Sequence, residues 1–242
     1  MTGTAVVIPA RMGSTRFPGK VLALLGGKPI VEWCWRAAVK ADLGPVLVAT
    51  ESRQVADAVE KFGGQAILTA ANISSGTDRV RAALKAAGLK TPRVINLQGD
   101  EPFMTAATLK AVDNLLRNGA QMSTAVVPLT NSVLAADPNT VKAAVAKDGR
   151  ALYFSRSPIP YHRNGTKGWF QHIGIYGFQT SILERFTKLR RSKLEIAESL
   201  EQLRALEDGI HIHAATVSQE TVAIDTPADL RRAARILSRG KS

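Results

Sequence analysis

Cysteine is nearly absent from this chain of 242 residues. Its one cysteine, Cys34, excludes an internal disulfide and lies in a helical pattern of apolar residues that predicts a core position. No apolar run approaches the roughly 20 residues that a membrane-spanning helix needs. The segment MTGTAVVIPAR lacks the basic region and long apolar stretch of a secretory signal. We therefore expect a cytosolic, cytoplasmic protein without an integral membrane segment.

Acidic residues are also scarce, since 20 Asp and Glu stand against 32 Lys and Arg and leave a net charge of +12. Such a charge favours anionic ligands, whether nucleotides, acidic sugars, nucleic acid or an anionic membrane surface. A nucleic-acid-binding protein concentrates its cations on one patch. Here they are spread along the chain, with denser stretches only at 188–193 and 231–241. We expect no nucleic-acid partner, although a basic nucleic-acid- or membrane-binding protein remains the non-enzymatic alternative.

The first half of the chain alternates short β-rich runs with amphipathic stretches. Repeated βα units of this kind predict an α/β fold with a mostly parallel, Rossmann-like three-layer sheet. Ligands of such sheets bind beyond the carboxyl ends of the strands, which places functional residues after Pro9, after Thr50, at 74–78 and at 98–102. The predicted strands are 5–9, 46–50, 66–69 and 94–97, and the predicted helices are 30–40, 54–62, 77–87 and 105–118.

The second half is less regular. Several short strand-like runs between residues 123 and 178 predict a small antiparallel lobe inserted into a single domain of residues 1–242. Beyond this lobe, the patterns predict helices at 181–188 and 195–207, a strand at 211–217 and a last helix at 227–237.

A loop rich in glycine and cations follows the first predicted strand, with the sequence PARMGSTRFPGK. Backbone N–H groups and cations can surround phosphate oxygens in such a loop. A Walker A motif requires four residues between its glycines and Ser or Thr after the lysine. Five residues separate Gly13 from Gly19 here, and Val21 follows Lys20. The residues alone leave open whether this loop cradles a polyphosphate or is a flexible basic turn.

The pattern PAR-x-x-S-x-R-x-PGK resembles the signature of the 3-deoxy-manno-octulosonate (Kdo) cytidylyltransferases. The similarity extends along essentially the whole chain. The further matching segments are SSGTDR at 74–79, NLQGDEPF at 96–103, ALYFSRSPIP at 151–160, HIGIYGF at 172–178, LEIAESLEQLRALEDG at 194–209 and IDTPADL at 224–230.

The resemblance implies a nucleotidyltransferase fold of the nucleotide-diphospho-sugar transferase type. It implies transfer of CMP from CTP to the anomeric hydroxyl of Kdo, which activates the sugar for lipopolysaccharide inner-core synthesis. It implies a homodimer that uses the 123–178 lobe, and it gives Arg11, Lys20 and Asp100 catalytic roles. The implied nucleotide-binding residues are Ala10, Arg11, Lys20, Ser75, Gly76, Gln98 and Asp100.

Two aspartates are candidate magnesium ligands. Asp100 follows an apolar strand, and Asp225 follows the apolar pair Ala223–Ile224. One or two carboxylates with substrate phosphates suffice for Mg²⁺. From spacing alone, Asp100 is equally well a turn-capping residue and Asp225 the N-cap of the last helix. The resemblance implies that both bind Mg²⁺. No nucleophile–base pair is evident, and we name no protein general base.

An acidic sugar requires a pocket that combines cations with neutral hydrogen-bonding groups. Each candidate also has an ordinary structural interpretation, such as a strand histidine, a solvated helix face or, for the turn at Ser75, a helix N-cap. The candidates implied by the resemblance are Arg79, Gln98, Arg156, His172, Tyr176, Glu201 and Gln202.

The choice of sugar stays open at this level. Sialate cytidylyltransferases share the fold, but they have a G-S-K-R-type opening loop and lack the QGDEP run found at 98–102. An 8-amino analogue of Kdo differs by a single hydroxyl-to-amine change, which need disturb none of these motifs. Kdo, 8-amino-Kdo and other acidic keto-sugars are therefore the candidate substrates.

Overall fold

The computed structural model describes residues 3–14, 16–165, 168–218 and 223–239. Thr15 of the opening loop and residues 166 and 167 of the 123–178 region lie outside the described residues. The chain divides into two units, Met1–Lys110 with Thr221–Ser242, and Ala111–Glu220. The 123–178 region falls within the second unit.

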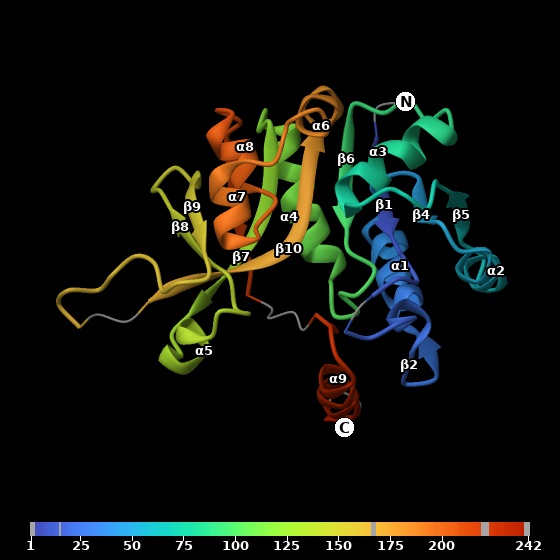
Figure 1. Ribbon diagram of the computed structural model, residues 1–242, viewed down its shortest axis with the longest axis horizontal. Coiled ribbons are helices and arrows are strands. Elements are labelled where there is room, and N and C mark those ends of the chain that lie inside the picture. Colours follow the sequence, from blue (N-terminus) through green and yellow to red (C-terminus); the bar gives the residue numbers. More distant parts are fainter. Residues whose placement is uncertain (1–2, 15, 166–167, 219–222, 240–242) are drawn as a thin grey trace. The chain divides into compact units, whose positions relative to one another are not determined.

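The first unit contains a parallel sheet with the strand order β6-β1-β4-β5 (Figure 1). All six residues of β1 are buried, which requires that both faces of the sheet be covered. This arrangement confirms the predicted parallel α/β fold. The strands are β1 (Thr4–Pro9), β4 (Val46–Thr50), β5 (Gln65–Leu68) and β6 (Arg93–Leu97).

The helices of this unit lie close to their predicted positions. They are α1 (Ile30–Ala41), α2 (Arg53–Lys61) and α3 (Gly76–Ala86), while α4 (Ala106–Arg117) spans the boundary between the units. Ser52 and Ser75 cap α2 and α3 with their side-chain oxygens. Cys34 is fully buried within α1, as the apolar pattern predicts.

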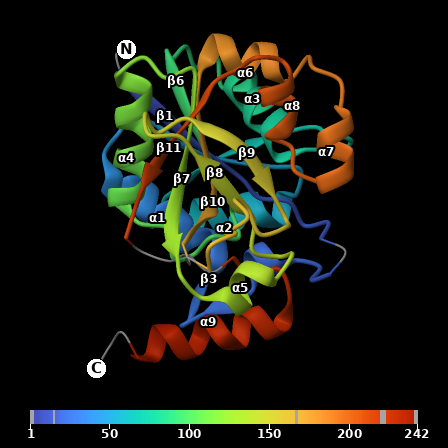
Figure 2. The ribbon, with the colours of Figure 1, turned by 90° about the vertical axis from the view of Figure 1, so that its left-hand side faces the viewer.

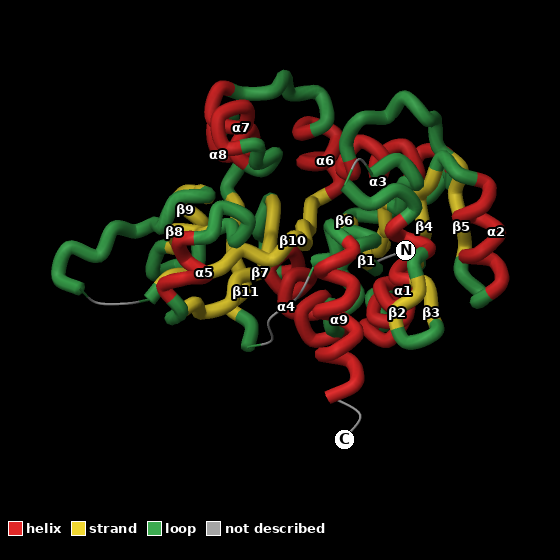
Figure 3. The backbone as a smooth tube through the Cα atoms, turned by 60° about the horizontal axis from the view of Figure 1, so that its bottom comes forward, coloured by secondary structure: helices red, strands yellow, loops and turns green. Residues whose placement is uncertain are grey.

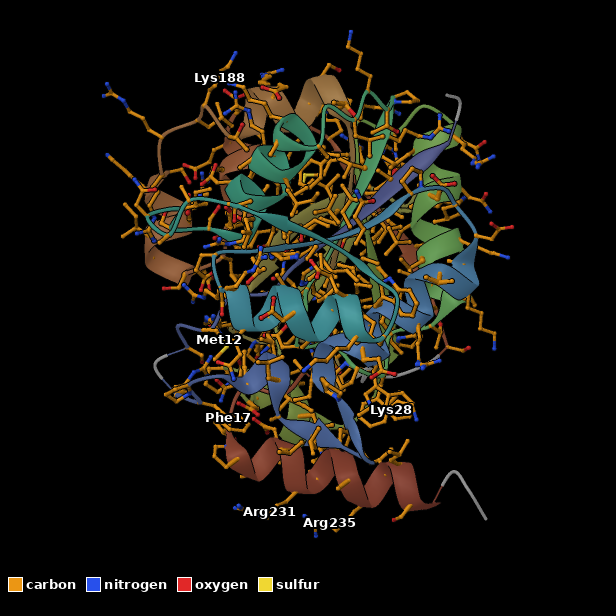
Figure 4. All side chains as sticks on the ribbon, turned by 90° about the vertical axis from the view of Figure 1, so that its right-hand side faces the viewer. Met12, Phe17, Lys28, Lys188, Arg231 and Arg235 are labelled. Atoms are coloured by element: carbon orange, nitrogen blue, oxygen red, sulfur yellow. The ribbon has the colours of Figure 1, made fainter. Side chains whose placement is uncertain are left out.

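The last helix packs on α1 and on β2, the first strand of a short hairpin that the sequence patterns did not indicate (Figure 3). The hairpin consists of β2 (Leu24–Leu25) and β3 (Lys28–Pro29), and the short 3₁₀ helix η1 (Lys20–Leu22) precedes it. Helix α9 (Pro227–Arg239) buries Ala233 against Leu25 and Ile30. Arg231 and Arg235 point away from this core, so the basic stretch of α9 is a solvated face (Figure 4). The apolar face of α9 fixes the segment that carries Asp225.

The second unit has a mixed sheet. The long strand β10 (Trp169–Gln179) runs antiparallel to β7 (Met122–Leu129), with a bulge between Ile173 and Tyr176. Strand β11 (Ile212–Thr216) is parallel to β7. Strands β8 (Lys142–Val145) and β9 (Ala151–Ser155) form a hairpin whose first strand pairs with β10 (Figure 2). The antiparallel character expected of this region is confirmed.

The predicted helix at 195–207 is wrong in one respect, because it is two helices, α7 (Lys193–Glu198) and α8 (Leu203–Glu207). The first of these helices ends at Ser199, which has a left-handed φ of 52°. Glu195 accepts two hydrogen bonds from the Arg204 guanidinium, each at 2.8 Å. Residues nine apart lie on opposite sides of a continuous helix, so this ion pair requires the break.

Two further helices, α5 (Ser132–Ala136) and α6 (Thr180–Phe186), complete the second unit. Among the described residues, no helix is both long and apolar enough to cross a membrane.

Candidate active site

A cavity of about 240 Å³ lies at the carboxyl ends of β1 and β6 in the first unit. Three segments predicted at strand ends therefore meet, namely the opening loop, the 74–76 turn and the turn after β6. The lining residues are Pro9, Arg11, Ser14, Arg16, Lys20, Val21, Ile73, Ser74, Ser75, Gly76, Arg79, Gln98, Gly99, Asp100 and Asp225. Ala10 is fully buried beneath the loop, and Arg11 is exposed at the cavity.

Lys20 extends between the two predicted metal ligands. Its Nζ donates to Oδ2 of Asp100 and, at 2.8 Å, to Oδ1 of Asp225. The backbone explains why the aspartates meet, because the Ile224 N–H donates to the carbonyl of Asp100 at 2.9 Å. Gly99 brings the turn against β1, since a Cβ there would lie only 2.9 Å from the Pro9 carbonyl oxygen. Two carboxylates 125 positions apart thus share one cation.

The charges in this cluster shift the pKa values of Lys20 and Asp225. Burial alone would lower the pKa of Lys20, but Asp100 and Asp225 outweigh it and raise that pKa above 10.5. Burial alone would raise the pKa of Asp225, but Lys20 and Arg16 bring it below 3.8. Arg16 contributes an ion pair of 3.0 Å to Oδ2 of Asp225. Lys20 and Asp225 are therefore both charged at neutral pH.

Asp225 is not the N-cap of the last helix, which was the ordinary interpretation of its position. Thr226 has that role, because its Oγ1 accepts from the Asp229 N–H at 3.2 Å. Asp229 in turn accepts from the Thr226 N–H at 2.9 Å. The carboxylate of Asp225 therefore lines the cavity, where it pairs with Lys20 and Arg16, and does not cap the helix.

The turn before α3 combines a helix cap with one wall of the cavity. Ser75 Oγ accepts from the Asp78 N–H at 3.0 Å and donates to the Asp78 carboxylate at 2.8 Å, which confirms the predicted N-cap. A Cβ on Gly76 would lie 3.2 Å and 3.3 Å from the amide atoms of Gln98. Gln98 is held by its amide nitrogen, which donates to Asn96 at 2.9 Å. Gly76 thus exposes backbone beside the Gln98 amide.

Arg79, a predicted sugar-binding residue, is only 3 % exposed. Its Nη1 donates to Thr69 Oγ1 at 2.6 Å and lies 3.1 Å from Oε2 of Glu51. Its Nη2 donates to the Ile73 carbonyl at 3.2 Å. Most of the guanidinium is therefore engaged within the protein, and binding of the sugar by Arg79 stays a prediction.

His172 and Tyr176 lie together in the second unit, with ring centroids 5.3 Å apart. Thr124 Oγ1 donates to the Ile175 carbonyl at 2.8 Å, so its 2.9 Å contact with Nε2 of His172 makes that nitrogen the donor. Burial lowers the pKa of His172 to about 3, and the ring is neutral. Burial, and then the carboxylate of Glu201, raise the pKa of Tyr176.

The other predicted sugar ligands of this unit differ in how far they are engaged. Arg156 donates to the carbonyls of Glu198 at 2.7 Å and Pro138 at 2.8 Å, so it ties β9 to the end of α7. Glu201 accepts from Arg204 at 3.3 Å. Gln202 is 3 % exposed, and its amide nitrogen has no hydrogen-bond partner among the described residues. Binding of the sugar by Gln202 stays a prediction.

Two residues of the first unit's cavity region were missed by the sequence patterns. Arg16 lies on the predicted loop but was given no role, and it pairs with Asp225. Glu51 directly follows Thr50, a strand end at which the sequence predicts functional residues without indicating which ones. The available signal was a carboxylate at the carboxyl end of a parallel strand.

Comparison with known proteins identifies the family of this chain. Residues 5–212 match the cytidylyltransferase family. The 3-deoxy-manno-octulosonate cytidylyltransferase of Elusimicrobium minutum is 48 % identical over 98 % of this chain and 99 % of its own length. That of Phocaeicola vulgatus is 43 % identical over 96 % of each chain.

Solved structures give the same result. A CMP:2-keto-3-deoxy-manno-octonic acid synthetase complexed with CTP superposes with a TM-score of 0.92 and 37 % identity, covering 98 % of this chain and 99 % of its own. HddC from Yersinia pseudotuberculosis, with a TM-score of 0.72 and 15 % identity over 97 % and 99 % of the two chains, shares the fold alone. The chain belongs to the cytidylyltransferase family and, within it, to the 3-deoxy-manno-octulosonate cytidylyltransferases.

Proposed function

We propose that this chain transfers CMP from CTP to the anomeric hydroxyl of 3-deoxy-D-manno-octulosonate, and that Asp100 and Asp225 bind Mg²⁺ for this reaction. The observation that carries the proposal is the sharing of the Lys20 ammonium by these two carboxylates within a cavity lined by cations. The names and near-complete coverage of the relatives support the choice of substrates.

The residues present fit Mg²⁺. Among the described residues, no three His, Cys, Asp or Glu side chains cluster as a complete metal cage. Mg²⁺ needs none, because it keeps several waters and takes one or two carboxylates plus substrate phosphates. The ammonium of Lys20 stands in for a cation at the Asp100 and Asp225 oxygens. When bound there, Mg²⁺ would polarise the α-phosphate and favour ionisation of the attacking hydroxyl.

The protein's own residues position the reactants and neutralise charge. The sugar hydroxyl oxygen forms a bond to the α-phosphorus, the bond from that phosphorus to the α–β bridging oxygen breaks, and pyrophosphate leaves. Arg11 and Lys20 offset the charge that develops on the leaving group. Ser75, Gly76 and Gln98 form the wall against which the cytosine is held. The hydroxyl proton passes to solvent, and no protein base is assigned.

One assay tests the proposal. Purified protein is incubated with CTP, Mg²⁺ and a panel of Kdo, 8-amino-Kdo, a sialic acid and no sugar, and pyrophosphate release is measured. We expect release that depends on both Mg²⁺ and Kdo. No release with any sugar, from protein whose circular dichroism shows it folded, would refute the reaction. Faster turnover of 8-amino-Kdo would make that sugar the proposed substrate in place of Kdo and leave the proposed reaction unchanged.

The proposal also includes a homodimer and a cytoplasmic location. The family resemblance supports the dimer, and the single cysteine is typical of a reducing compartment. Light scattering coupled to gel filtration should give about twice the 25.9 kDa of one chain. A mass of one chain at micromolar concentration would contradict the dimer.

A further inference from the structure

The Glu51 carboxylate lies between two elements of the candidate active site. Glu51 follows β4 directly, and its side chain is 18 % exposed. Its Oε1 accepts from the Met12 N–H at 2.9 Å. Its Oε2 lies 3.1 Å from Nη1 of Arg79. One carboxylate thus contacts the opening loop on one side and the arginine of α3 on the other.

The backbone of Met12 holds two later residues of the opening loop. Its carbonyl oxygen accepts from the N–H groups of Ser14 and Gly19, each at 3.0 Å. Gly19 directly precedes Lys20, whose ammonium lies between Asp100 and Asp225. Since Glu51 holds the N–H of Met12 and Met12 holds Gly19, the position of Lys20 depends on Glu51 through two hydrogen bonds. Figure 4 labels Met12.

Arg79 connects the same carboxylate to the turn before α3. Its Nη2 donates to the Ile73 carbonyl, two residues before Ser75, and its Nη1 donates to Thr69. The Thr69 hydroxyl and N–H both donate to the Thr50 carbonyl, at 3.2 Å and 2.8 Å. The turn is thus anchored to Thr50 at the end of β4, the residue directly before Glu51.

A carboxylate beside an anion-binding cavity is unfavourable unless its charge is offset. Arg79 offsets the charge of Glu51 within the protein. The Glu51 carboxylate presents two charged oxygens, one that accepts from the Met12 N–H and one that forms an ion pair with Arg79 without a hydrogen bond. An uncharged amide has one acceptor oxygen and one donor nitrogen instead. Glutamine at position 51 could still accept from the Met12 N–H, but it would lose the ion pair and place donor N–H groups against the Arg79 guanidinium.

We propose that Glu51 is a positioning residue for CTP, which sets the spacing between the triphosphate loop and the base-binding turn. This inference rests on the proposed binding of CTP in this cavity. Glu51 does not touch the reacting atoms. Because it links the two parts of the site, it affects ligands that span both parts more than ligands that fill one.

The test compares CTP with CMP, which lacks the β- and γ-phosphates. Dissociation constants of both are measured calorimetrically with Mg²⁺ and without sugar, for wild type, Glu51→Gln, Glu51→Asp and Glu32→Gln. Glu32 is a control because it is a buried carboxylate paired with Arg36 on α1, outside the cavity lining. Thermal unfolding is recorded for every variant, and kcat and KM are measured with both substrates.

We expect Glu51→Gln to weaken CTP on the order of tenfold and CMP about twofold, so that the preference for CTP over CMP shrinks about fivefold. The KM for CTP should rise while kcat and the KM for the sugar change little. Glu51→Asp keeps both acceptors on a shorter side chain and should be intermediate, and Glu32→Gln should keep the wild-type preference. An unchanged preference in Glu51→Gln would overturn the inference, even if the variant is less stable. Failure of the wild type to bind CTP would overturn the proposed function along with it.

Discussion

The ammonium nitrogen of Lys20 lies 2.8 Å from Oδ1 of Asp225, although 205 positions separate the two residues along the chain. Asp100 shares the same ammonium. A cation that binds these two oxygens would therefore compete with the Lys20 ammonium. The triphosphate of CTP offers Lys20 an alternative anionic partner, so metal binding and nucleotide binding should favour each other.

Replacement of Lys20 should strengthen metal binding in the absence of nucleotide. In Lys20→Met, the two carboxylates lose their shared counter-ion, and Mn²⁺ should bind about tenfold more tightly than in wild type. Electron paramagnetic resonance of free Mn²⁺ measures this affinity. Lys28→Met, which removes a cation that lies over Trp33 instead, should leave it unchanged. Equal or weaker Mn²⁺ binding by Lys20→Met would show that the ammonium does not occupy the metal position.

Replacement of Asp100 should abolish turnover without unfolding the protein. Asp100→Ala removes a proposed metal ligand whose side chain is 23 % exposed, while its backbone carbonyl still binds the Ile224 N–H. We expect pyrophosphate release to fall by a factor of about 10³ or more. The circular dichroism spectrum should remain that of wild type. A rate within a few-fold of wild type would remove Asp100 from the metal site.

Local patterns predicted the parallel half of the fold well. The strand ending at Pro9 and the helix containing Cys34 have the right residues in the right order, because their periodicity reflects burial within one element. Short-range chemistry also predicted the Ser75 cap. The boundaries of such elements depend on neighbours a few residues away.

What the patterns missed depends on contacts between distant residues. The break at Ser199 follows from the pairing of Glu195 with Arg204, and no glycine or proline marks it. The role of Glu51 depends on partners 39 and 28 positions away, Met12 and Arg79. The prediction that Asp100 and Asp225 both bind Mg²⁺ rested on resemblance to a family, since spacing alone could not distinguish a metal ligand from a turn or helix cap.

The burial of His172 should make unfolding take up a proton at mildly acidic pH. Its pKa is about 3 in the folded chain against 6.5 when unperturbed, so the unfolded state binds the extra proton. Its contribution to stability is complete above pH 6.5 and decreases as the pH falls from there toward 3. In His172→Gln, the free energy of unfolding should fall less steeply as the pH is lowered from 6.5 to 4.5. The slope should correspond to about one proton fewer taken up on unfolding than in wild type. Urea titrations at several pH values measure this slope, and identical slopes in both proteins would contradict it.

A methyl group on Gly76 should impair CTP binding through Gln98. In Gly76→Ala the new Cβ would lie 3.2 Å and 3.3 Å from the Gln98 amide atoms and 3.4 Å from Cγ of Pro9. These distances are tight enough to shift the amide, and we expect the dissociation constant for CTP to rise about fivefold.

A double-mutant cycle separates this cause from a general disturbance of the helix end. In the Gln98→Ala background the crowded amide is absent, so Gly76→Ala should change CTP binding less than twofold. If the methyl group weakened binding equally in both backgrounds, the contact with Gln98 would not be the cause. In that case the Pro9 contact, or access of the ligand to the backbone at position 76, would carry the effect.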